Sequence, residues 1–229
     1  FGAAKGEYPT ISALATLAYD TRRPDFFRAE LMHGVHMVQN GLSADRMKGS
    51  WAGAFGNFQF MPSTFRHFGT DYDGDGQVDL WDSLPDALAS AANYLSSEGW
   101  NPAVGWGREV LLPKKFDWDL IERKKPLREW MADGIVFADG APVAEPPSTQ
   151  AELFLPAGIH GPAFLTFSNF RVILKWNRSV LYAVSVGHLA DRIQGTSQFS
   201  KKYFQRGPSF TLENAQEVQE LLTKMKLYD

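Results

Sequence analysis

Residues 48–63 read KGSWAGAFGNFQFMPS. The small residues at positions 53, 54 and 56 carry little or no side chain, so a backbone or a ligand can approach them closely. Gln59 adds an amide and its aromatic neighbours add flat faces, a combination that binds sugars through hydrogen bonds and stacking. From these residues alone two interpretations stay open: a tight turn packed in a core, or a saccharide-binding surface.

An acidic segment follows closely, and residues 71–82 read DYDGDGQVDLWD. Aspartates at loop positions one, three and five, glycine at six and an apolar residue at eight match the calcium loop of an EF-hand. Position twelve holds an aspartate instead of the usual glutamate, and its arm is shorter. The pattern predicts one structural calcium or sodium ion, and the alternative is an acidic solvated turn. The expected ligands are Asp71, Asp73, Asp75, the backbone carbonyl of Gln77, and Asp86, with Asp82 as the alternative to Asp86.

On either side of these segments, apolar residues recur at helical spacing. This spacing predicts helices over residues 10–19 and 24–39, a helix starting at Pro62, and helices from Pro85 to Gly99, after Pro162 and over 179–193. Between them, short β-prone runs separated by Gly, Pro and Asp predict a small β-subdomain over about 107–160. Three prolines within residues 141–148 predict an exposed loop.

The composition excludes several classes of protein. A chain of 229 residues that is 44% hydrophobic can bury a sizeable core, so wholesale disorder is excluded. Lys plus Arg (23) do not exceed Asp plus Glu (26), which argues against nucleic acid as a partner. The absence of cysteine excludes disulfides and thiolate sites. No run approaches the roughly 18 apolar residues of a membrane span. The five histidines form no metal-ligand pattern, so we expect structural roles for them.

Several spaced motifs together resemble the B-type (membrane-bound and soluble) peptidoglycan lytic transglycosylases of bacterial cell walls. In order along the chain they are residues 13–19 before the arginines at 22 and 23, then 53–63, 80–81, 92–94, 169–170, 176–179 and 182–184. The resemblance implies an α+β, mainly α, lysozyme-like domain over 1–195, with the β-subdomain inserted and the single EF-hand-like loop. It further implies a linker over 196–209, and over 210–229 the first helix of a truncated peptidoglycan-binding module.

The same resemblance implies an activity. A lytic transglycosylase is a glycan lyase that cleaves the MurNAc-β-1,4-GlcNAc bond without water and leaves 1,6-anhydromuramoyl ends, using one glutamate as acid and then base and no catalytic cofactor. The family motif places that glutamate three residues before Phe1, so we expect these 229 residues alone to be inactive. Glu7 and Glu30 are the nearest carboxylates, but neither matches the motif. A hydrolytic muramidase and a non-catalytic peptidoglycan-binding scaffold remain the alternatives.

Site residues follow from the resemblance by position. Ser50 is expected beside the acid, and Gln59 against the saccharide or its acetamido group. The remaining expected substrate-binding residues are Arg22, Arg23, Phe60, Tyr94, Trp176, Asn177 and Tyr182. The alternative for the tyrosines is a structural position in the core. The alternative for the arginines is that they are simply solvated on the surface. The expected partner is the peptidoglycan glycan strand, in the periplasm or cell envelope of a bacterium. A lipid anchor or a wall-synthesis partner would lie outside this chain.

Overall fold

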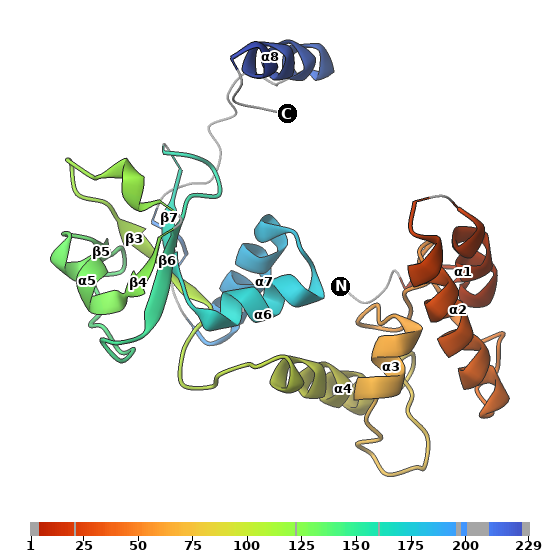
Figure 1. The fold of residues 1–229 in the computed structure, drawn as a ribbon. Coiled ribbons are helices and arrows are strands. Elements are labelled where there is room, and N and C mark those ends of the chain that lie inside the picture. Colours follow the sequence, from red (N-terminus) through yellow and green to blue (C-terminus); the bar gives the residue numbers. More distant parts are fainter. Residues whose placement is uncertain are drawn as a thin grey trace. The chain divides into compact units, whose positions relative to one another are not determined.

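The computed structural model describes residues 5–20, 22–121, 123–159, 161–195, 198–200 and 211–225. It divides into two units, Phe1–Pro102 and Ala103–Asp229, and each is considered by itself (Figure 1). Helices outweigh strands, which confirms the predicted α+β, mainly α class. Among the described residues no helix has the length and apolar character that crossing a bilayer requires.

The first unit is built from helices and one very small sheet. Its helices are α1 (Thr10–Tyr19), α2 (Pro24–Gln39), α3 (Pro62–Phe68) and α4 (Leu84–Ser97). Strands β1 (Tyr8–Pro9) and β2 (Lys48–Gly49) pair antiparallel, with Tyr8 opposite Gly49. Proline stands in the first turn of α2, α3 and α4, where its missing N–H costs no hydrogen bond, so these predicted starts are confirmed.

The core of the first unit lies under the loop of residues 48–60. Leu14 of α1, Met47 and Phe55 are fully buried. Phe55 stacks on Trp81, with ring centroids 4.9 Å apart and planes 10° from parallel. The loop is therefore fixed from below by α1 and by the end of the acidic segment.

The second unit contains the larger sheet. Its strands are β3 (Gly107–Leu111), β4 (Lys124–Pro126), β5 (Val136–Phe137), β6 (Gln150–Phe154) and β7 (Ala163–Thr166). They lie in the antiparallel order β4-β6-β7-β3-β5, so the predicted β-subdomain is confirmed and extends to Thr166. Its helical elements are the 3-10 turn η1 (Trp118–Leu120), α5 (Leu127–Ala132), α6 (Ser168–Trp176), α7 (Val180–Ile193) and α8 (Leu212–Lys224).

One predicted element is wrong. The apolar run after Pro162 was expected to begin a helix, but residues 163–166 form strand β7, and the helix starts only at Ser168. Phe164 packs with the cluster under α6 and α7, whereas Leu165 packs with the cluster under α5. In Figure 1 these helices cover opposite faces of the sheet. A strand buried on both faces shows a continuous apolar run, which periodicity cannot distinguish from a buried helix.

The loops and the C-terminal part agree with expectation where the structure describes them. Residues 141–148 contain no helix or strand and are mostly exposed, as the prolines predicted. The expected linker over 196–209 lies outside the described residues except for 198–200. A helix, α8, stands within 210–229, and its assignment to a peptidoglycan-binding module stays a prediction.

Candidate functional site

The loop of residues 48–60 is held by backbone hydrogen bonds. The N–H of Ser50 donates to the carbonyl of Ala54 at 2.7 Å, and the N–H of Gly53 donates to the carbonyl of Ser50 at 3.0 Å. The Ser50 hydroxyl accepts a third bond from the N–H of Ala54 at 3.2 Å. Phe55 and Phe60 exchange two backbone bonds, at 2.9 and 2.8 Å, which closes the hairpin that carries Gln59.

Three glycines allow close packing in and around this loop, Gly6 and Gly49 against backbone and Gly53 against a side chain. A Cβ on Gly6 would lie 2.0 Å from the carbonyl oxygen of Gly49, and a Cβ on Gly49 would lie 2.0 Å from that of Ala54. A Cβ on Gly53, whose φ is +84°, would lie 2.4 Å from a methyl carbon of Leu14. We call the surface made by Gly6, Gly49, Gly53 and Ala54 the glycine ledge. No larger residue fits in it.

Gln59 has a strained backbone. Its φ is 56°, and it is the one non-glycine residue with positive φ in the part of the chain that the structure describes. Its side-chain amide donates to the carbonyl of Gly56 at 3.0 Å and to the carbonyl of Lys5 at 3.1 Å. Strain of this kind persists where the surroundings fix the residue, and it concentrates at functional sites. The amide thus ties the hairpin to the segment that leads to β1.

Phe60 and Tyr94 lie together beneath the hairpin. Phe60 is only 2% exposed, and its ring centroid lies 6.3 Å from that of Tyr94. Tyr94 of α4 is half-buried, and burial, with a smaller contribution from Glu98, raises the pKa of its hydroxyl. Phe60 therefore supports the hairpin from the core, and a direct role for it in binding stays a prediction.

The two predicted arginines stand between α1 and α2. Both are exposed. The backbone N–H of Arg22 donates to the Asp20 carboxylate at 2.9 Å, and the guanidinium of Arg23 lies 4.1 Å from the centroid of the Phe26 ring. Solvent-facing guanidinium groups at this turn are available to an acidic ligand.

The second unit brings three further predicted residues together at the turn between α6 and α7. Trp176 is the last residue of α6, and Asn177 caps it. The Asn177 side chain accepts from the N–H of Ser179 at 2.9 Å, and the Ser179 hydroxyl caps α7 by accepting from the N–H of Tyr182 at 3.3 Å. Burial raises the pKa of the Tyr182 hydroxyl. The predicted binding residues therefore form separate groups within the two units.

The acidic loop gathers three carboxylates. Oxygens of Asp71, Asp73 and Asp86 all lie within 4.8 Å of one another. Asp86, 1% exposed, accepts backbone bonds from Tyr72 at 2.8 Å, Asp79 at 2.9 Å and Asp73 at 3.4 Å. Burial alone would raise the pKa of Asp86, but these N–H groups outweigh it and hold the pKa below its usual value. The Asp86 side chain is therefore ionised, and its orientation is fixed by backbone hydrogen bonds.

Asp82, the alternative ligand, points elsewhere. Its carboxylate lies 2.9 Å from the guanidinium of Arg46, which also bonds Asp79 at 2.7 Å. Asp75 stays within the loop and accepts from the backbone N–H of Gln77 at 2.8 Å. The geometry favours Asp86 over Asp82 as the third member of the cluster.

Glu30 and Glu7, the two carboxylates that do not match the motif of the catalytic acid, have no special surroundings. Glu30 of α2 is 4% exposed, and it accepts from both the N–H and the hydroxyl of Ser63, at 2.9 and 2.6 Å. It thereby satisfies the start of α3, a structural role. Glu7 is exposed.

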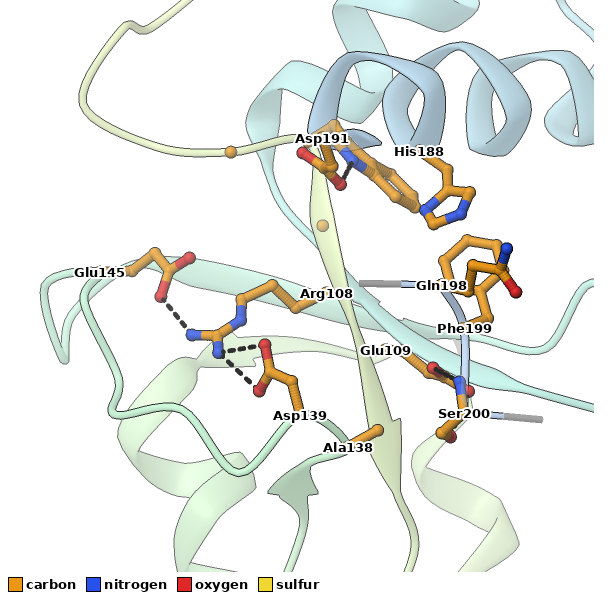
Figure 2. Close-up of a pocket in the computed structure, with 13 residues that line it drawn as sticks. Arg108, Glu109, Ala138, Asp139, Glu145, His188, Asp191, Gln198, Phe199 and Ser200 are labelled. Atoms are coloured by element: carbon orange, nitrogen blue, oxygen red, sulfur yellow. Dashed lines mark hydrogen bonds and ion pairs between the residues drawn. The ribbon is translucent and has the colours of Figure 1, made fainter. Parts of the chain in front are cut away.

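A cavity of about 280 Å³ in the second unit is lined by none of the predicted site residues (Figure 2). Several of its polar side chains are paired with one another. Arg108 bonds Asp139 at 2.9 and 3.0 Å, and Trp106 donates to Asp191 at 2.7 Å. Residues 198–200 close one side, where Phe199 stacks on His188 and Ser200 donates two bonds to Glu109. These contacts fasten residues 198–200 to α7 and β3.

Comparison with known proteins gives one consistent picture. Residues 1–191 match the family model described as a transglycosylase SLT domain. The chain is 31% identical over 201 residues to the membrane-bound lytic murein transglycosylase B of Escherichia coli K12, covering 84% of this chain and 53% of that protein.

Solved structures agree. SltB3 from Pseudomonas aeruginosa, in complex with NAG-NAM-pentapeptide, matches with a TM-score of 0.90 and 43% identity, covering 98% of this chain and 61% of that one. Slt35 from Escherichia coli, in complex with calcium, matches with a TM-score of 0.71 and 30% identity, covering 84% and 61%. The chain thus spans between half and two thirds of the length of these relatives. The predicted fold family is confirmed.

Proposed function

The chain belongs to the SLT-domain transglycosylase family, and from this premise we propose that its protein is a peptidoglycan lytic transglycosylase. It cleaves the bond between N-acetylmuramic acid and N-acetylglucosamine without water and leaves 1,6-anhydromuramoyl ends. The membership reaches residue 191 and so includes both groups of predicted binding residues.

The observation that carries the proposal is the Gln59 hairpin. A strained, exposed glutamine held at 3.0 and 3.1 Å by two backbone carbonyls is costly unless its position is used. Its amide belongs to the same loop as the glycine ledge, where segments of the first unit pack closely on one another. SltB3, which shares the fold at 43% identity, has also been solved with NAG-anhNAM-pentapeptide, an anhydro sugar of the kind that this reaction forms.

We assign the residues as the resemblance predicts. The acid and base is the glutamate three positions before Phe1, outside the 229 residues. Ser50 orients it: the hydroxyl already accepts from Ala54, so its own proton is left to donate. Gln59 binds the acetamido group or the sugar. Tyr94, Trp176, Asn177 and Tyr182 bind the glycan, Phe60 supports them from the core, and Arg22 and Arg23 bind acidic parts of the stem peptide.

A structural calcium ion is the second part of the proposal. Asp71, Asp73 and Asp86 offer hard oxygen ligands within 4.8 Å of one another, which suits Ca²⁺ or, less strongly, Na⁺. Asp75 and the carbonyl of Gln77 complete the expected set, while Asp82 stays with Arg46. The ion ties the acidic loop to the start of α4 and takes no part in the reaction.

The site of action follows from the substrate. Peptidoglycan lies in the bacterial cell envelope, so we propose the periplasm or envelope as the compartment and the glycan strand as the partner. The relative in Escherichia coli is named membrane-bound.

Product analysis tests the proposed function. The full-length protein is incubated with purified peptidoglycan, and the released muropeptides are analysed by mass spectrometry. We expect anhydromuramoyl ends, which are lighter by one water than the reducing ends of a hydrolytic muramidase. Reducing ends would replace the transglycosylase by the muramidase. Binding without release would favour the scaffold.

A further inference from the structure

Trp51 is the most exposed tryptophan of the seven, at 66%. Trp81, Trp106 and Trp130 are at most 7% exposed, and Trp118 lies edge-on against Phe116. Trp51 makes no ring contact and no side-chain hydrogen bond with any residue that the structure describes. A single exposed aromatic is common on protein surfaces, so exposure alone does not indicate a function.

The backbone under Trp51, however, is rigid. Trp51 is the second residue of the turn that the bond from Gly53 to Ser50 closes at 3.0 Å. Two further bonds between Ser50 and Ala54 hold the base of the turn. Gly53 packs closely on the fully buried Leu14, which supports the turn from the core side. An aromatic ring on a fixed backbone loses little conformational entropy when it binds a ligand.

Tyr8, a second exposed aromatic residue, belongs to the strand that pairs with the segment just before Trp51. Tyr8, 60% exposed, lies opposite Gly49 in the β1–β2 pair, and Trp51 follows Gly49 by two residues. Tyr8 likewise makes no ring contact and no side-chain hydrogen bond among the described residues. The glycine ledge between the two positions carries no side chain beyond the methyl group of Ala54. Two exposed aromatic side chains thus belong to neighbouring positions of the paired segments, Tyr8 opposite Gly49 and Trp51 two residues after it.

The neighbouring polar groups point to the class of ligand. Ser50 directly precedes Trp51, and the Gln59 amide belongs to the hairpin that follows. Flat apolar faces next to a few fixed donors and acceptors suit a pyranose ring, which has an apolar C–H face and polar edges. The Gln59 amide nitrogen is already bonded to Gly56 and Lys5 and the Ser50 hydroxyl accepts from Ala54, so the amide oxygen and the hydroxyl proton are what they offer to a polar ligand.

We propose that Trp51, assisted by Tyr8, is a stacking platform for one N-acetylhexosamine ring of the glycan strand, next to the site that Ser50 and Gln59 mark. The inference rests on the proposed function and adds to it a specificity-determining residue. Trp51 sets how tightly the strand is held and takes no part in proton transfer. The platform contacts only the sugar ring, so binding to it does not require the stem peptide.

Titration calorimetry with chitotetraose tests this, because that probe is a pure N-acetylglucosamine chain with neither peptide nor muramic acid. The full-length protein is compared with Trp51→Ala, Trp51→Phe and Tyr8→Ala, and with Trp118→Ala as the matched exposed control. We expect Trp51→Ala to bind about tenfold more weakly and Trp51→Phe within about threefold of the unmodified protein. Tyr8→Ala should lose less than Trp51→Ala, and Trp118→Ala should lose nothing. The Trp51 and Tyr8 variants should keep the melting temperature, since these side chains are exposed and make no ring contact with a described residue.

Tryptophan fluorescence gives an independent reading. Chitotetraose should change the emission of the unmodified protein, and this change should be clearly smaller in Trp51→Phe although the variant still binds, with Trp176 as the source of the remainder. A folded Trp51→Ala with unchanged affinity overturns the inference alone. A loss seen only with peptide-bearing fragments also overturns it, in favour of a peptide contact. If the unmodified protein binds no glycan at all, the proposed function fails and the platform with it. If binding follows Trp51 but the peptidoglycan products have reducing ends, only the transglycosylase assignment fails.

Discussion

The side-chain amide of Gln59 donates a hydrogen bond of 3.1 Å to the backbone carbonyl of Lys5, 54 residues earlier in the chain. Lys5 also donates from its ammonium group to the carbonyl of Trp81. One short segment before β1 thus connects the hairpin with the end of the acidic loop. Displacement of the hairpin, of the segment at Lys5 or of the end of the acidic loop would therefore disturb the other two.

Gln59→Gly is expected to separate stability from binding. A residue with a side chain costs about 1 kcal/mol more than glycine at a φ of 56°, so Gln59→Gly should be about 1 kcal/mol more stable than Gln59→Ala. Both variants lose the amide and should lose glycan binding. Urea denaturation and calorimetry measure the two effects. Equal unfolding free energies for the two variants would show that the hairpin relaxes instead of holding the strain.

Gly53→Ala is expected to be far more harmful than Gly41→Ala. Both positions have positive φ, at +84° and +98°, but only Gly53 faces an obstacle, the buried Leu14. Gly41→Ala should cost about 1 kcal/mol of unfolding free energy, and overpacking should bring Gly53→Ala to about 2–4 kcal/mol. Denaturant midpoints give the comparison, and similar losses at both positions would contradict the described packing of the ledge on α1.

Calcium is expected to raise the melting temperature, and a chelator to lower it. An ion that binds only the folded state at 100 times its dissociation constant adds about 2.7 kcal/mol. Asp86→Asn should abolish the calcium-dependent shift, while Asp82→Asn should keep it because Asp82 is bonded to Arg46. Differential scanning calorimetry with and without chelator provides the measurement. An unchanged melting temperature for the unmodified protein would show that the acidic loop binds no stabilising calcium ion.

Acid is expected to weaken the contact between α7 and residues 198–200. Burial lowers the pKa of His188 below 6.5, and Arg192 adds to this, whereas Asp191 and Glu109 partly oppose it. The folded state therefore favours the neutral imidazole. Stability should be full above about pH 6.5 and fall as the pH drops from there toward the lowered pKa.

His188→Gln carries no titrating ring and is the control for this pH dependence. Unfolding free energies measured between pH 8 and pH 5 should decline less for His188→Gln than for the unmodified protein. Asp191→Asn removes a charge that opposes the shift, so in that variant the pKa of His188 should fall further. A parallel decline in the unmodified protein and in His188→Gln would assign the acid sensitivity to other groups.

Local signals predicted much of the fold, and distant contacts account for what they missed. The prolines that open α2 and α3 can be recognised because their effect is confined to one helical turn. Strand β7 could not be recognised, because its burial depends on helices that pack from both sides.

The candidate site shows the same division. Loop spacing predicted Asp86 as a candidate ligand, and the resemblance predicted Ser50 and Gln59 as site residues. The strain at Gln59 and its bond to Lys5 were not, since they arise only once segments 54 residues apart meet. The pairing of Asp82 with Arg46, 36 residues away, was equally invisible, and it is the contact that favours Asp86 as the ligand.

Phe199 and Ser200 have a practical consequence for anyone who wishes to shorten the protein. Phe199 stacks on His188 with centroids 3.7 Å apart and also meets the buried Phe164 at 5.1 Å, while Ser200 bonds Glu109 of β3. A fragment that stops where α7 ends would uncover aromatic surface and leave a carboxylate without its donors. A stable recombinant fragment should therefore end beyond Ser200, and fusion partners or tags belong after that point.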